Sequence, residues 1–327
     1  MNQYIPLPTL PTPPPFDWEG WYGAVGGRTI DIPEANEWLR KIFQEQYPRF
    51  DGDVNPAQRS FTSPSEASTW VKGLARLHGA DIVGICRVEP ADVYAGRTVP
   101  HRFAIVVGAR MLYDAFVTVP SKEAAVECLR VYHALGETVI ALASDLRTAG
   151  HACTIEHPIG DSSVLHIPLA LKAGFGELGR HGSIIHPEFG PLFRIGSVLC
   201  DLDLACDEPI DAGIGAFCDR CKACRIFCPA DAIPDERSSD HGLDPQGNPR
   251  YIVDTGKCFP YFARANYCSA CLATCAYQHK RWATLHDGSV GQYPTVPFGT
   301  VPPAVDPDIP HHPYPQLRRD SASPHHR

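Results

Sequence analysis

The segment FCDRCKACRIFCP, residues 217–229, carries the clearest chemical signal in this chain of 327 residues. Its four cysteines follow the spacing C-x2-C-x2-C-x3-C-P, which is a ligand run of bacterial iron–sulfur clusters. A cubane cluster needs thiolates that approach it from several directions. Cys218, Cys221 and Cys224 lie on a short segment that can wrap around three iron corners. The segment therefore predicts a redox protein.

A second set of cysteines follows downstream. In two-cluster ferredoxins the fourth cysteine of such a run ligates the other cluster, so Cys228 predicts further ligands. The segments TGKCFPYF and YCSACLATC supply them, which makes eight thiolates for two [4Fe–4S] clusters. By the crossed arrangement of that fold, we assign one cluster to Cys218, Cys221, Cys224 and Cys275. We assign the other cluster to Cys228, Cys258, Cys268 and Cys271.

Zinc and disulfides are the alternatives for cysteines spaced in this way. Paired C-x2-C units also build tetrahedral zinc sites, but zinc sites do not need a run that ends in Cys-Pro. Disulfides belong to oxidising compartments, which nothing else in the sequence indicates. The remaining cysteines show no ligand spacing and are expected to be small buried hydrophobes. They are Cys86, Cys128, Cys153, Cys200 and Cys206.

The composition limits the class of partner. The net charge is −8 and no basic patch or stripe is visible, which argues against nucleic acid or an anionic membrane as the main partner. The first 18 residues have neither a basic n-region nor an apolar h-region, and no apolar run reaches membrane-spanning length. We therefore expect a cytoplasmic protein with no DNA partner and no membrane span.

Helices and strands alternate between two proline-rich ends. The prolines at 6–15 and 294–315 predict flexible, extended arms. Hydrophobic patterning between the arms indicates an α+β fold, with α/β as the alternative. Helices are predicted at 63–79, 121–150 and 165–179, and strands at 80–88, 103–111, 151–158 and 191–204.

The segment GFGELGRHGS has two interpretations. Gly174, Gly176 and Gly179 have the spacing GxGxxG, but they follow a predicted helix rather than a strand, so a nucleotide-binding loop is poorly supported. The glycines could simply permit a tight turn with positive φ. Alternatively, their bare backbone could lie against a large flat cofactor, with Arg180 and His181 at its edge. The sequence does not separate these interpretations.

Several segments together resemble one family. They are GADIVGI at 79–85, the stretch 168–204, the cysteine run, and the stretch from VDTGKCFPYF to CSACLATC. They resemble the corrinoid-dependent reductive dehalogenases and, more distantly, the epoxyqueuosine reductases. The resemblance implies a nitroreductase-like cobalamin-binding domain followed by a ferredoxin-like domain. The expected parts are a proline-rich arm and lead-in at 1–60, the corrinoid domain at 61–210, the two-cluster domain at 211–285 and a Pro/His-rich tail at 286–327.

The resemblance also implies an electron path. Electrons from a low-potential donor such as a ferredoxin or flavodoxin would pass through two [4Fe–4S] clusters to cobalamin or a related cobamide, which reduces a small organohalide. None of the fifteen histidines has an Asp two positions earlier, so the D-x-H-x-x-G motif of histidine-ligated corrinoids is absent. This fits a base-off cofactor, and it fits equally well no corrinoid at all.

For the proton donor, the resemblance points to LRVYHAL at 129–135. Epoxyqueuosine reductases have an Asp where this chain has Val131, which cannot donate a proton. Tyr132 lies where the dehalogenases present a tyrosine, and we predict it as the catalytic acid. A phenol with a pKa near 10 needs a cationic neighbour to give up its proton, for which Arg194 is the candidate and Lys172 a second one. Tyr132 could instead be a packed core tyrosine, and Arg194 part of a structural ion pair.

Two other functions stay open. An epoxyqueuosine-reductase-like enzyme acting on tRNA is disfavoured by Val131 and by the acidic net charge. The other is a two-cluster electron-transfer protein whose corrinoid domain binds nothing. A measured corrinoid content would distinguish this electron carrier from both the dehalogenase and the epoxyqueuosine-reductase-like enzyme.

Overall fold

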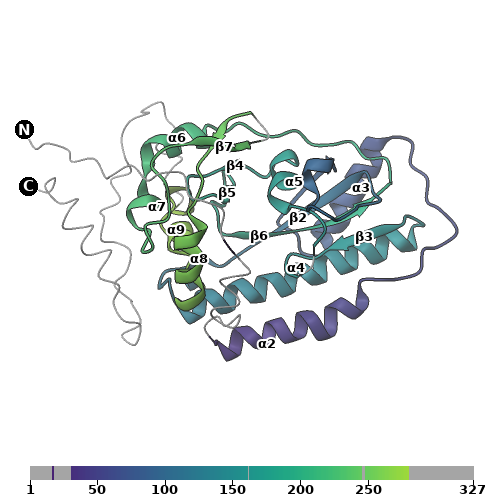
Figure 1. The fold of residues 1–327 in the computed structure, drawn as a ribbon. Coiled ribbons are helices and arrows are strands. Elements are labelled where there is room, and N and C mark those ends of the chain that lie inside the picture. Colours follow the sequence, from purple (N-terminus) through teal and green to yellow (C-terminus); the bar gives the residue numbers. More distant parts are fainter. Residues whose placement is uncertain (1–16, 18–30, 161, 245–246, 280–327) are drawn as a thin grey trace, which may run out of the picture.

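The computed structural model describes residue 17 and residues 31–160, 162–244 and 247–279. There the chain forms a mixed helix-and-sheet fold, in which a four-stranded sheet and its helices lie beside a smaller part (Figure 1). The smaller part carries the eight cysteines from Cys218 to Cys275. The predicted arms at 6–15 and 294–315 lie outside the described residues. No helix in the described ranges is long and apolar enough to cross a membrane.

The central sheet is antiparallel throughout, with the strand order β1-β2-β6-β3. Its strands are β1 (Ile82–Arg87), β2 (Phe103–Arg110), β3 (Cys153–Glu156) and β6 (Phe193–Cys200). All four strands fall inside the stretches where the sequence predicts strands. Because β-branched and aromatic side chains suit a pleated, buried surface, these short apolar runs form strands rather than helices.

Helices cover both faces of the sheet. Side chains of β2 alternate between two cores, since successive residues of a strand point to opposite faces. Phe103, Ile105 and Val107 join the core shared with α3 (Pro64–Leu77) and α4 (Lys122–Thr148). Ala104 and Val106 join the core shared with α5 (His166–Lys172). Burial on both faces explains why the strand appears in the sequence as a continuous apolar run.

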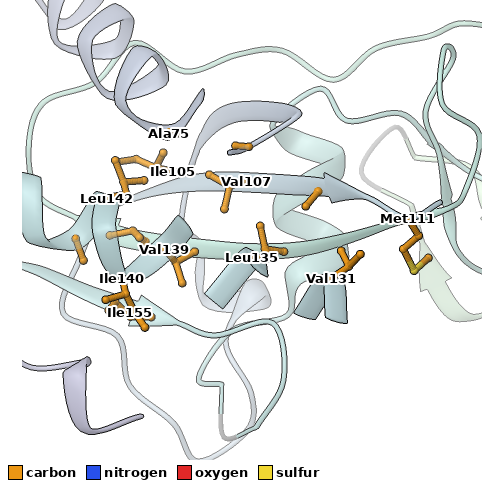
Figure 2. Close-up of a cluster of buried hydrophobic side chains, with 14 of the residues drawn as sticks. Ala75, Ile105, Val107, Met111, Val131, Leu135, Val139, Ile140, Leu142 and Ile155 are labelled. Carbon is orange, nitrogen blue, oxygen red and sulfur yellow. The ribbon is translucent and has the colours of Figure 1, made fainter. Parts of the chain in front are cut away.

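Helix α4 is the longest element and matches the helix predicted at 121–150. It begins where the hydroxyl of Ser121 accepts a hydrogen bond from the Ala124 N–H (3.3 Å), and the chain leaves it through Gly150 at φ +82°. Its apolar face packs against the sheet. Figure 2 shows Val131, Leu135, Val139, Ile140 and Leu142 of this helix in the core beside Ile105 and Val107.

A helix without a counterpart in the sequence prediction packs beside α4. The segment after residue 31 forms α2 (Pro33–Lys41), a π-helical turn (Ile42–Gln46) and a 3-10 turn (Tyr47–Arg49). The side chain of Gln46 donates to the carbonyl of His133 (2.8 Å) and to Glu137 (2.9 Å). Part of the lead-in expected at 1–60 is therefore packed against the core.

The smaller part lies at the end of the molecule away from β3 (Figure 1). It contains the strand pairs β4–β5 (Glu177–Leu178, Ile184–Ile185) and β7–β8 (Ser238–Leu243, Pro249–Arg250). Its helices are α6 (Ile214–Cys221), α7 (Ala223–Ile226), α8 (Thr255–Arg264) and α9 (Ala270–Ala273), followed by a 3-10 turn (Ala276–His279). Leu272 and Ala273 of α9 join the core of the sheet domain, so the two parts share one packed interface.

Candidate functional site

The first group of cysteines surrounds a hollow. Cys218 and Cys221 lie on α6, Cys224 lies on α7, and Cys275 follows α9. All four line the same hollow, which has about 290 Å³ of empty space. Lys222 connects α6 to α7 with φ +32°, a left-handed conformation that turns the chain sharply between the second and third cysteines. Four thiols therefore line one shared hollow.

The second group lies next to the first. Cys228, Cys258 and Cys271 belong to one apolar cluster, and Cys268 interacts electrostatically with Cys228 and Cys258. Cys271 interacts with all three of the others and also with Cys224 of the first group. Four thiols line the hollow and the other four lie beside it, and Cys224 joins the apolar cluster of Cys228, Cys258 and Cys271. That each set ligates a cluster remains a prediction.

Burial dominates the chemistry of these thiols. It raises the pKa of Cys218 and Cys268 to about 12 and that of Cys258 to about 11. A buried thiolate needs a positive charge beside it, which iron would supply, and cluster binding would therefore release protons. All thirteen cysteines are free, and within the described ranges no three His, Cys, Asp or Glu side chains converge as ligands of a single metal ion.

Glu177 holds the start of the helix that carries Cys218 and Cys221. Its Oε1 accepts hydrogen bonds from the N–H groups of Ala212 (2.6 Å) and Ile214 (3.1 Å), and its Oε2 accepts one from Gly215 (2.9 Å). A carboxylate suits this place because the first N–H groups of a helix lack partners within the helix. No spacing signal in the sequence singles out Glu177, since it lies 37 residues before Ile214.

Tyr132 and Arg194 lie together in the sheet domain. The guanidinium carbon of Arg194, on β6, lies 4.8 Å from the centre of the Tyr132 ring, on α4. Its Nη2 donates to the sulfur of Cys128 (2.8 Å), while its buried Nε has no hydrogen-bond partner. Burial alone would lower the pKa of Arg194, but Cys128 and Tyr132 raise it above its ordinary value. A permanent positive charge therefore lies against the predicted acid.

The glycine turn faces other parts of the chain rather than open space. A Cβ at Gly176 would lie 2.1 Å from the carbonyl oxygen of Ile185, and one at Gly179 would lie 2.6 Å from the Ile185 side chain. Gly174 has φ +77° and Gly176 φ +149°, as the turn interpretation requires. These contacts pack Gly176 and Gly179 against Ile185, and the approach of a flat cofactor to this turn stays a prediction.

Arg180 and His181 point toward the first cysteine group. Both line its hollow, and Arg180 is held by backbone carbonyls of the cysteine loop. The Nδ1 atom of His181 accepts from the Ser183 N–H (3.1 Å), and its buried Nε2 has no partner. Burial lowers the pKa of His181 to about 4, so its ring is neutral at pH 7.

The structure also shows the surroundings of Lys172 and Cys206. The ammonium of Lys172 is bonded to Asp92 and to the carbonyl of Arg87 (2.9 Å), whereas Arg194 contacts the tyrosine. Among the remaining cysteines, Cys206 is exposed, so the expectation of a buried hydrophobe is wrong there. It lies in a connecting segment after β6, where neither a strand nor a helix covers it.

A larger groove lies where β2 ends and β6 begins. It has about 1140 Å³ of empty space, open to solvent. Among the residues that line it are Arg110, Met111 and Gln278, and the side-chain oxygen of Gln278 is buried without a partner. The sulfur of Met111 lies 3.8 Å from that of Cys128, the cysteine bonded to Arg194. The groove is therefore separated from the Tyr132–Arg194 pair by the side chains of Met111 and Cys128.

Comparison with known proteins finds no matching family model. The tetrachloroethene reductive dehalogenase of Dehalobacter restrictus is 32% identical to this chain over an alignment that covers 80% of this chain and 59% of the relative's own length. The enzyme of the same name from Sulfurospirillum multivorans is 28% identical over 69% of this chain and 53% of its own length. The chain thus spans a little over half the length of these curated relatives. The epoxyqueuosine reductase of Salmonella typhimurium is 37% identical, but over only 32% of this chain.

Solved structures of reductive dehalogenases also match the fold of this chain. The catabolic reductive dehalogenase NpRdhA, in complex with 3-bromo-4-hydroxybenzoic acid, matches with a TM-score of 0.67 and 26% identity, over 75% of this chain and 37% of its own. A structure described as suggesting a mechanism for B12-dependent dehalogenation matches with the same TM-score and 25% identity, over the same shares of both chains.

Fold and relatives together place the chain among homologues of oxidoreductases. Within that class it is a homologue of the reductive dehalogenases, and the resemblance expected from the sequence is confirmed.

Proposed function

We propose that this chain is a cobamide-dependent reductase that receives electrons through two [4Fe–4S] clusters and removes halide from an organohalide. The similarity to tetrachloroethene reductive dehalogenases over 80% of the chain carries the proposal. The brominated ligand of one solved neighbour and the B12 dependence named for another support this class of substrate and cofactor. A small organohalide would be the substrate, and a ferredoxin or flavodoxin the electron donor.

The two groups of cysteines would hold the clusters within a ferredoxin-like domain at 211–285. The hollow that the first four thiols line, and the raised pKa of Cys218 and Cys271 under burial, fit such groups. A base-off corrinoid would be held by the nitroreductase-like domain at 61–210, and the groove beside Met111 offers it space. When bound, the clusters supply single electrons and the corrinoid supplies the two-electron reduction of the carbon–halogen bond.

Tyr132 would supply the proton. Replacing a carbon–halogen bond with a carbon–hydrogen bond takes two electrons and one proton, and it releases a halide ion. The phenol of Tyr132 gives its proton to the carbon that loses the halide, and Arg194 stabilises the phenolate that remains. The partnerless Nε of Arg194 leaves one donor of the guanidinium available for a hydrogen bond to an anion.

Halide release tests this function. The cobalamin-loaded, reduced protein should release chloride or bromide from a panel of chlorinated ethenes and brominated phenols. Tyr132→Phe should lower the rate at least 100-fold with iron and cobalt contents unchanged, because proton transfer by a positioned acid contributes about 10²–10⁴-fold. Tyr94→Phe, at a half-exposed tyrosine, is the matched control and should keep the rate. Full turnover by Tyr132→Phe would exclude Tyr132 as the acid.

A further inference from the structure

Arg180 is a buried cation bound to the loop of the first cysteine group. Its side chain is 1% exposed. The guanidinium donates to the carbonyl of Cys218 through Nε (3.2 Å) and Nη2 (2.8 Å), and to that of Asp219 through Nη2 (3.2 Å). Its Nη1 donates to the carbonyls of Pro234 (3.0 Å) and Asp235 (2.5 Å). Five hydrogen bonds therefore fix the position of the charge.

Arg180 has no directly paired carboxylate in the described part of the chain. Among the described residues none forms an ion pair with Arg180, whose remaining contact is the Tyr251 ring, 4.2 Å from the guanidinium carbon. The other fully buried arginine of this region, Arg225, is also 1% exposed but pairs with Asp231 and Asp235. An arginine cannot lose its proton inside a protein, so Arg180 carries a permanent positive charge. Carbonyl dipoles and the Tyr251 ring contact it directly, and the Asp219 carboxylate, which pairs with Arg237, interacts with it from a greater distance.

The charge acts on one group of cysteines. Arg180 lines the hollow of the first group together with Cys218, Cys221, Cys224 and Cys275, and it donates two hydrogen bonds to the carbonyl of Cys218. No cysteine of the second group is among the residues that line this hollow, and none of the hydrogen bonds of Arg180 goes to that group. The two groups therefore differ in their electrostatic surroundings.

We propose that Arg180 raises the reduction potential of the cluster held by the first group above that of the cluster held by the second. The inference rests on the two proposed clusters. Reduction adds one negative charge to a cluster and its thiolates, and a fixed positive charge at low dielectric stabilises that state. At equilibrium a single electron from the donor then resides on the first cluster, so the two clusters have different roles in electron transfer.

A redox titration followed by electron paramagnetic resonance tests the proposal on the reconstituted full chain, with dithionite as reductant. Arg180→Gln should lower the equilibrium constant for reduction of the first cluster at least tenfold, which is about 59 mV for one electron. The second cluster should be unchanged and serves as the control within the same molecule. Arg180→Lys keeps the charge and should retain most of the wild-type potential. Variants Cys275→Ser and Cys258→Ser identify the signal of each cluster.

A second variant covers the case in which Arg180→Gln does not assemble its cluster. Asp219 is a half-exposed carboxylate beside the same loop and pairs with Arg237 (2.8 Å). Asp219→Asn removes a negative charge, so it should raise the potential of the first cluster alone, by less than Arg180→Gln lowers it. Equal shifts of both clusters, or no shift in either variant, would overturn the role of Arg180. A wild-type protein with fewer than two clusters would overturn the proposed function as well.

Discussion

Replacement of Glu177 by alanine should loosen the helix that presents Cys218 and Cys221. The change removes the acceptors of three backbone N–H groups, at 2.6, 2.9 and 3.1 Å. Hydrogen bonds to a charged group contribute about 1.5–3 kcal/mol each, but water can replace part of this at a partly exposed helix start. We therefore expect the free energy of local opening at 212–221 to fall by about 2 kcal/mol, which corresponds to roughly 30-fold more opening.

Hydrogen exchange followed by mass spectrometry measures this opening directly. Peptides from the start of α6 should exchange about 30-fold faster in Glu177→Ala, and an iron chelator should remove iron faster from the loaded protein, because two predicted ligands lie on this helix. Glu177→Gln keeps one carbonyl oxygen and should give an intermediate rate. Glu188→Ala removes an exposed glutamate and is the control. Equal exchange in Glu177→Ala and Glu188→Ala would refute the role of Glu177 in holding α6.

Three further predictions concern the cysteine groups, acid stability and the core. Cys275→Ala and Cys258→Ala should each lower the iron content by about half, and the double variant should bind almost none; equal spectra for the two single variants would contradict the separate groups. Burial lowers the pKa of His157 to about 4. Between pH 6.5 and 4 the folded chain therefore binds fewer protons than the unfolded chain, and its stability falls as the pH drops through this range. His157→Asn should reduce this pH dependence of the free energy of unfolding, measured with urea at pH 7 and at pH 5. Leu142 is fully buried, and Leu142→Ala should lower the free energy of unfolding by about 2–5 kcal/mol, against less than 0.5 for the exposed Leu77→Ala.

The local elements could be predicted because their signals are local. Ser121 and Gly150 bracket a helix, and the structure has α4 between them. The β-branched run at 103–111 is a strand because its side chains fill two cores. Helix α2 escaped prediction because its burial depends on α4, which lies about a hundred residues further along the chain. Only the folded chain shows that these helices pack together.

The candidate site was predictable in its residue types but not in its surroundings. The cysteine spacing suggested two groups of four ligands, which stays a prediction. The resemblance pointed to Tyr132, the need for a cationic neighbour pointed to Arg194, and the structure places these two side chains in contact. The roles of Glu177 and Arg180 depend on backbone groups 35 to 55 residues away, which no spacing rule reports. The glycine turn is the opposite case. Its GxGxxG spacing resembles a binding motif, whereas in the folded chain Gly176 and Gly179 pack against Ile185.

The content of iron, sulfide and cobalt per chain tests the central claim most directly. The protein should be expressed with cobalamin available and purified without oxygen, and its visible spectrum recorded beside the metal analysis. The proposed function predicts about eight irons, about eight sulfides and about one cobalt per chain, from two cubane clusters and one corrinoid. Eight irons with no cobalt, even after reconstitution with cobalamin, would contradict a corrinoid reductase and leave a two-cluster electron carrier.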